Sequence, residues 1–146
     1  MSWPQTGFAD THYVETLAVV VFVTSIDFFC RALGVPPHAL PTPKPGSPTR
    51  HRPPGALLEQ AWVPMIAHNN ASGLEGDLYG RHRYPNVGRA LSLIPDEVRG
   101  LVDLMTAQYM PVYHVADASY EPERAITRAQ VELLAGRVSA INECFY

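Results

Sequence analysis

The 146-residue sequence lacks several features that mark specialised proteins. It has only two cysteines, Cys30 and Cys144, too few for a disulfide-stapled secreted scaffold. A reducing cytoplasm is therefore the expected location, and pairing of these two thiols would need chance geometry in an oxidising setting. Its 11 basic and 14 acidic residues give a net charge of −3, without the basic excess that phosphate backbones attract. We expect no nucleic-acid partner.

Cofactor and metal motifs are also missing. The sequence has no phosphate loop, no dinucleotide fingerprint and no HExxH zinc pair. The six histidines show no ligand spacing and are interpreted as surface or capping side chains. They are His12, His38, His51, His68, His82 and His114. The basic cluster Arg81 to Arg83 is explained by a solvated loop. We expect no cofactor and no metal.

The uncharged apolar run near the N-terminus is interpreted as too short for a membrane span. The start of the chain lacks the basic region of a secretory signal. The uncharged run from Thr16 to Ile26 ends at Asp27, well short of the roughly 18 to 20 residues that a spanning helix requires. We expect a buried helix here and no membrane partner.

This apolar run lies inside a longer predicted helix, from Asp10 as N-cap to Leu33, with Gly34 as its C-terminal stop. The β-branched stretch 19–23 would suit a strand, but the length of the segment favours a helix. Because residues 17–29 are apolar nearly all round, the helix needs more cover than this chain can supply.

Proline, by contrast, is abundant, and eight of the 14 prolines lie between residues 35 and 55. Proline lacks an N–H donor and has a fixed φ, so this stretch predicts an extended connector. A proline-rich ligand for an SH3-type domain is the alternative interpretation.

The remaining sequence indicates helices, and the predicted fold class is all-α. Short helical pieces are expected over Leu57–Trp62, Leu74–Arg83 and Val87–Leu93. A longer amphipathic helix should begin at Pro95 and end before Pro111. No alternating strand pattern competes with these elements.

The last helix is predicted to open on a capping box formed by Thr127 and Gln130. Its core-facing side should consist of four apolar residues. They are Val131, Leu134, Ala135 and Val138.

The segment after this cap carries the most specific pattern. It reads Glu132-Leu-Leu-Ala-Gly-Arg-Val-Ser-Ala-Ile-Asn-Glu-Cys144-Phe-Tyr146. This resembles the signature E-L-x-A-x-x-V-S-A-x-N-x-C-x-Y-C of the AhpD-like alkylhydroperoxidase and carboxymuconolactone decarboxylase superfamily. The upstream stretches 61–64, 78–79 and 84–95 resemble the peroxidase-related branch of the same family.

The resemblance implies an AhpD-like helical fold that is incomplete at its C-terminus, and it divides the chain into three parts. Residues 1–34 are similar to the closing helix of an AhpD-like unit. Residues 35–56 form the proline-rich linker, and residues 57–146 resemble the front of a catalytic unit. Either the tail of a preceding repeat or an N-terminal helix swapped onto a neighbouring subunit would give this order.

One departure from the family pattern concerns its second cysteine. That residue would follow Tyr146 directly, with a histidine a few residues later, so the chain as written lacks the peroxidatic residue. We expect the next codon to be UGA for selenocysteine. A degraded gene, a clipped fragment and a frameshift are the alternatives.

The resemblance also implies a function, a thiol- or selenol-dependent peroxidase or disulfide oxidoreductase acting on organic hydroperoxides. Glu132 would relay protons and Cys144 would be the resolving thiol. The partners would be a small hydroperoxide, a thiol reductant protein and further copies of the chain.

The geometry adds a requirement. An unbroken helix would separate Glu132 from Cys144 by about 18 Å, so the chain must turn near Asn142. We expect Asn142 to be the N-cap of a new helix, with Cys144 in its first turn.

Several alternatives remain open. The same fold could catalyse lactone decarboxylation, or the chain could be an inactive fragment or oligomerisation partner. Glu132 could serve only the helix dipole. Cys144 could be a small buried apolar residue, as we expect of Cys30.

Overall fold

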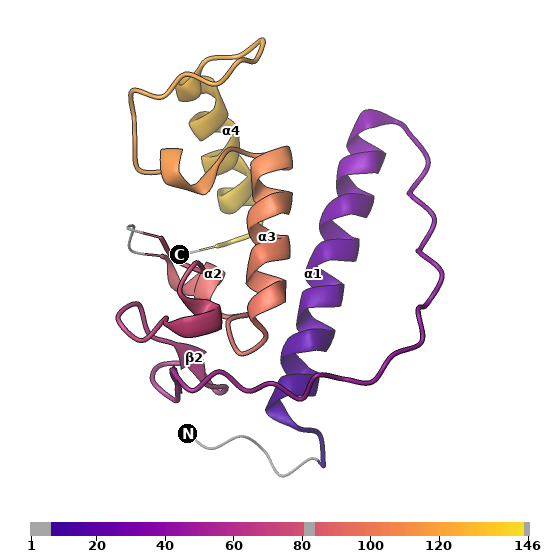
Figure 1. The fold of residues 1–146 in the computed structure, drawn as a ribbon. Helices are drawn as coiled ribbons and strands as arrows, with labels where there is room; N and C mark the ends of the chain where they lie inside the picture. The colour runs from indigo at the N-terminus through magenta and orange to yellow at the C-terminus, as the bar shows by residue number, and fades with distance from the viewer. Residues whose placement is uncertain (1–6, 81–83, 145–146) are drawn as a thin grey trace. The chain divides into compact units, whose positions relative to one another are not determined.

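The fold is helix-rich, as a computed structural model of residues 7–80 and 84–144 shows (Figure 1). Within these residues there are four α-helices, two short 3₁₀ helices and one two-stranded sheet. The predicted all-α class is confirmed in part, because the described residues are mostly helical but include a small two-stranded sheet. The predicted helical content of Arg81–Arg83 lies outside the described residues.

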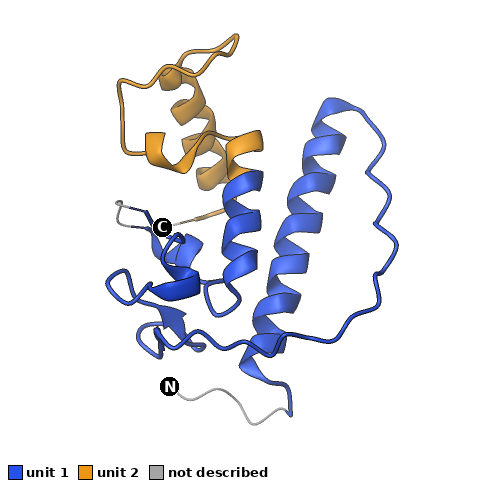
Figure 2. Cartoon of the chain, viewed as in Figure 1, with its two compact units in different colours: residues 1–104 blue, residues 105–146 orange. Residues whose placement is uncertain are grey.

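Two compact units make up the chain, residues 1–104 and residues 105–146 (Figure 2). Their boundary falls inside one helix, α3 (Pro95–Gln108). The first unit therefore holds both the N-terminal helix and the connector, which the sequence assigned to separate segments.

Helix α1 covers Asp10–Leu33, as predicted. The prediction of a buried helix was wrong, because only Val14 and Ala18 of α1 are buried. At its C-terminal end Gly34 has φ 69°, its N–H donates to the carbonyl of Arg31, and the N–H of Val35 donates to that of Cys30. This left-handed closure is favourable for glycine, which has no Cβ. The predicted N-cap was wrong by one residue. Ala9 is the N-cap, and Asp10 is the first helical residue, where its charge still favours the positive end of the helix.

Residues 35–53 have no regular secondary structure, as expected of a stretch so rich in proline. Its end is attached to the first unit at two points. The Arg52 guanidinium donates to both carboxylate oxygens of Asp10, at 3.0 and 2.7 Å. His51 Nε2 lies 2.5 Å from the carboxylate of Glu75, which is buried.

The helical piece predicted over Leu57–Trp62 was wrong. Residues Ala56–Leu57 (β1) pair antiparallel with Met65–Ile66 (β2). The extended form of Ile66 is stabilised by tertiary contacts, since Ser92 Oγ accepts from its N–H at 2.8 Å and the Tyr79 hydroxyl donates to its carbonyl at 2.9 Å. These partners lie 26 and 13 residues away, so local pattern could not reveal the strand.

The other short helices are smaller than predicted. A 3₁₀ helix, η1, covers Gly73–Glu75, and helix α2 covers only Asn86–Arg89. Helix α3 begins at Pro95 as expected, and Asp96 and Glu97 lie in its first turn. The core of the first unit gathers around these elements. It includes Val14, Ile66, Leu91, Leu93 and Val98.

The second unit contains η2 (Val112–His114) and helix α4 (Arg128–Ile141). The capping box is confirmed, because the Thr127 side chain accepts from the Gln130 N–H and the Gln130 side chain accepts from the Thr127 N–H. The predicted core face is only partly buried. Val131 is buried, whereas Leu134 and Val138 remain more than half exposed.

Candidate functional site

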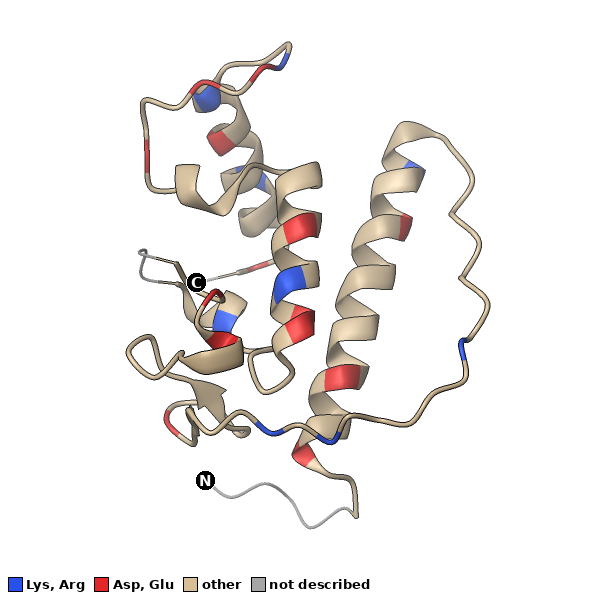
Figure 3. Ribbon diagram, in the orientation of Figure 1, with Lys and Arg blue, Asp and Glu red and all other residues tan. Residues whose placement is uncertain are grey.

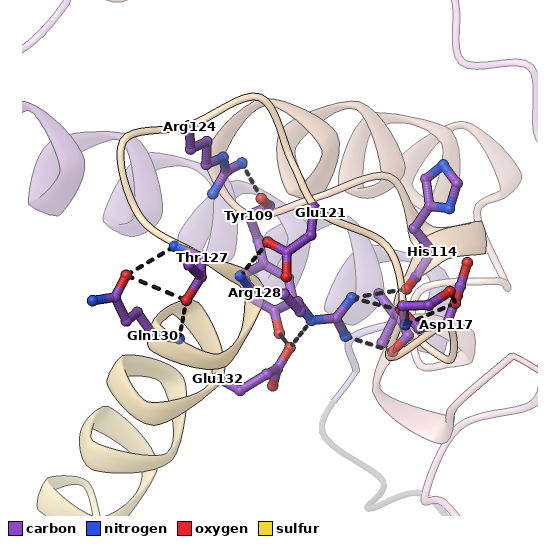
Figure 4. A network of polar contacts seen from close by, with 11 residues as sticks. Tyr109, His114, Asp117, Glu121, Arg124, Thr127, Arg128, Gln130 and Glu132 are labelled. Atoms are coloured by element: carbon purple, nitrogen blue, oxygen red, sulfur yellow. Dashed lines mark hydrogen bonds and ion pairs between the residues drawn. The ribbon is translucent and has the colours of Figure 1, made fainter.

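The candidate site surrounds Glu132, in the second turn of α4 (Figure 4). Both of its hydrogen bonds fall on one carboxylate oxygen, Oε1. The Tyr109 hydroxyl and the Arg128 Nε each donate to this atom at 2.7 Å. The side chain is 46% exposed, and no described residue donates to its second oxygen, Oε2. Glu132 thus presents one unoccupied acceptor to solvent.

These two donors also determine the charge of Glu132. The Tyr109 hydrogen bond lowers the pKa of Glu132 most, partial burial opposes it, and Arg128 lowers it further. Conversely, burial and the bond to Glu132 raise the pKa of Tyr109 to about 12. At neutral pH the pair is therefore a carboxylate and a neutral phenol, with the phenol as the donor.

Arg128 is the best-connected side chain of this unit, and its side chain is only 8% exposed. Besides Glu132, its guanidinium donates to three backbone carbonyls, those of His114, Val115 and Asp117. The backbone N–H of Arg128 donates to the carboxylate of Glu121. A cation at the end of η2 is favourable because helix carbonyls there lack partners.

The segment that Arg128 holds has a defined shape. The rings of His114 and Tyr120 stack, with centroids 3.6 Å apart and planes within 4°. Asp117 accepts from both the N–H and the hydroxyl of Ser119. The loop from 112 to 121 is thus organised by local contacts and joined to α4 through Arg128.

Cys144 lies at the opposite end of α4 and is exposed. Asn142 is the C-cap of the helix, and Glu143 follows with φ 51°. The N–H of Glu143 donates to Ala140 and that of Cys144 to Ser139, which is the hydrogen-bond pattern of a Schellman closure.

This closure corrects the expected setting of Cys144. The described structure places the residue after a helix C-terminus, whose carbonyls favour cations, and not in the first turn of a helix, whose N–H groups favour a thiolate. A further helix starting here would include residues 145 and 146, which lie outside the described residues.

Glu132 and Cys144 are therefore not brought together by the described part of the chain. The Cys144 N–H bonds to Ser139, seven residues beyond Glu132 and about 10 Å along the helix axis. The carboxylate of Glu132 extends the other way, toward Arg128 one turn earlier. The turn near Asn142 exists, but it does not bring the sulfur back to the glutamate.

Neither a disulfide nor a metal centre is formed among the described residues. Cys30, half-buried on α1, and Cys144 are both free thiols. No group of three histidine, cysteine or acidic side chains is arranged to hold a metal ion in residues 7–80 and 84–144. His82 lies outside this part of the chain.

Helix α1 is long and apolar enough to cross a membrane, the one such helix in the described chain. It carries only Asp10, Glu15, Asp27 and Arg31 as charged residues (Figure 3). The criterion uses length and composition alone, and core helices and N-terminal signal sequences also meet it. The prediction of no membrane partner stays a prediction.

Two contributors to the site were not found from the sequence. Arg128 precedes Glu132 by four residues, so helical spacing could have revealed that contact. Tyr109 has no such signal, because it lies 23 residues away from Glu132.

Comparison with known proteins finds no matching family model, no matching curated protein and no matching solved structure.

Proposed function

We propose that residues 57–146 form the front of an AhpD-like thiol peroxidase unit that reduces organic hydroperoxides. Glu132 is the proton relay, and Cys144 is the resolving thiol. The spacing of the two within the motif suggests these roles, and one structural observation supports the first. Glu132 is a partly exposed carboxylate with Oε1 occupied by two donors and Oε2 without a donor among the described residues.

The proposed chemistry begins at the residue that the family pattern places after Tyr146. Its thiolate or selenolate attacks the hydroperoxide, the O–O bond breaks, and a sulfenic or selenenic acid forms. The thiol proton passes through Glu132 to the leaving alkoxide, which becomes an alcohol. The Cys144 thiol then attacks the sulfur of the sulfenic acid, or the selenium of the selenenic acid. Water leaves, and a disulfide or a selenenyl sulfide forms.

A dithiol reductant protein completes the cycle. By exchange it restores both groups and becomes a disulfide itself, which is possible in a reducing cytoplasm. Glu132 serves this scheme only if further chain brings Cys144 near its Oε2. We propose that, in a longer chain, a helix that begins at Cys144 replaces the exposed end and brings the Cys144 thiol near Glu132 Oε2.

Peroxide consumption tests this function. We expect no turnover of tert-butyl hydroperoxide with dithiothreitol by the 146-residue chain, and turnover by a version extended with cysteine after Tyr146 and histidine a few residues later. In the extended version Glu132→Gln should lower the rate about 100-fold, because general acid–base catalysis contributes at least that much. Glu123→Gln, which removes another exposed carboxylate of the same unit, is the matched control.

Other results would replace the proposal. An extended chain that folds by circular dichroism but leaves peroxide untouched contradicts it, as does a Glu132→Gln rate equal to the control. Decarboxylation of a carboxymuconolactone by the same protein would establish the lyase. Inactivity in both assays would indicate that the chain is an inactive fragment or oligomerisation partner.

We also propose that the chain associates with copies of itself through α1. The helix buries Val14 and Ala18 within its own chain, while the opposite side carries exposed apolar residues. The residues on this second side recur at alternating intervals of three and four positions, which is the spacing of a helix that packs along another helix. Its exposed apolar members are Val19, Val23, Ile26 and Leu33, and the polar Thr16 and the half-buried Cys30 complete the spacing.

Sedimentation at several concentrations tests this association. Val19→Glu places a charge in the repeat and should weaken self-association about tenfold or more. Val20→Glu is the control, because Val20 is similarly exposed (55% against 58%) but lies beside the repeat. A monomeric parent chain contradicts the proposal. Equal losses in both variants, together with binding to phosphatidylcholine vesicles, would indicate a membrane contact instead.

A further inference from the structure

The guanidinium of Arg128 joins two parts of the second unit that are separate in sequence. One N–H group, on Nε, donates to the Glu132 carboxylate at 2.7 Å. The other nitrogens donate to His114 and Asp117 at 3.1 Å and to Val115 at 2.9 Å. The guanidinium is planar and rigid, so these directions cannot change independently.

We infer that Arg128 is a positioning residue that couples the orientation of the Glu132 carboxylate to the conformation of the 112–117 loop. Displacement of the loop removes the carbonyls that hold the guanidinium plane, and the bond to Oε1 is then lost or redirected. The role of Glu132 in catalysis rests on the proposed function, but the coupling does not.

Tyr109 provides an internal comparison. Its hydroxyl donates to the same Oε1, and neither its hydroxyl nor its backbone has a hydrogen bond to the 112–117 loop among the described residues. Its carbonyl accepts from Arg124. Removing the Tyr109 hydroxyl should therefore disturb Glu132 without loosening the loop, whereas changing Arg128 should affect both.

Nuclear magnetic resonance of the full chain tests the coupling with two readouts. The first is the pH titration of the Glu132 side-chain carboxyl carbon. The second is hydrogen exchange of the Val115 and Asp117 amides, which donate to Val112 and His114 inside the loop. Arg128→Lys keeps the charge but loses the planar fork.

The expected results differ among three variants. Arg128→Lys should raise the pKa of Glu132 and speed both exchange rates about tenfold. Tyr109→Phe should raise the same pKa and leave exchange unchanged. Glu132→Gln should speed loop exchange about two- to fivefold, because coupling between two sites is reciprocal.

Two results would overturn the inference, unchanged loop exchange in Glu132→Gln or loosening of the loop in Tyr109→Phe equal to that in Arg128→Lys. If Arg128→Lys does not fold, the other two variants still decide the question, since both alter partly exposed side chains. None of these readouts uses peroxide. Inactivity of the extended version toward peroxide, with coupling intact, would therefore refute the proposed function alone. Activity of the extended version without coupling would refute this inference alone.

Discussion

Replacing Arg128 with alanine is expected to lower the free energy of unfolding by about 3 kcal/mol, because a nearly buried charged hydrogen-bond network loses its centre. The guanidinium makes four hydrogen bonds, and three of its acceptors are backbone carbonyls that have to find water instead. Urea denaturation followed by circular dichroism measures the loss. Exchange of the Val115 and Asp117 amides shows whether it is concentrated in the loop.

Arg137→Ala is the matched control, since Arg137 lies on the same helix and is exposed. Its replacement should change stability by no more than about 0.5 kcal/mol. Equal effects of the two substitutions would show that charge on α4 matters and that the loop contacts do not.

Leu93→Ala should have an equal or larger effect in the first unit. Leu93 is fully buried in the connection that precedes α3, beside the buried residues Leu91 and Ser92. Truncating such a side chain removes apolar contacts and leaves a cavity, at a cost of about 2 to 5 kcal/mol. The midpoint of urea denaturation should fall accordingly.

The comparison for this prediction is Leu74→Ala. Leu74 is 76% exposed, so its truncation should shift the midpoint little. If both leucines gave the same small change, the buried cluster around Leu93 would not be the core that stabilises this unit.

Local signals predicted those elements whose causes are local. The ends of α1 follow from composition and Gly34, the connector from its prolines, and the capping box from the spacing of Thr127 and Gln130. The start of α3 follows from Pro95. In each case the deciding interaction is within a few residues, where sequence pattern is informative.

Errors arose where distant residues decide the conformation. Ile66 is extended because Tyr79, Arg89 and Ser92 bond to its backbone, and nothing in residues 56–66 alternates as a strand should. The helix expected around 57–62 does not form, because tertiary contacts that the local sequence does not reveal favour an extended conformation nearby.

The candidate site divides in the same way. Glu132 and Cys144 were identified from the resemblance of one short segment, which depends only on residue types and their spacing. The helix end at Asn142 reversed the electrostatic setting expected for Cys144, because the residue follows carbonyls and does not precede N–H groups.

By itself the sequence determined a mostly helical chain with an apolar first helix, a proline connector and a capped last helix, because these depend on neighbouring residues. Tertiary structure alone decided that Glu132 has Tyr109 and Arg128 as donors, and that Arg128 also holds the 112–117 loop. Those bonds join residues 11 to 23 positions apart in all but one case, and only folding brings such groups within hydrogen-bond distance.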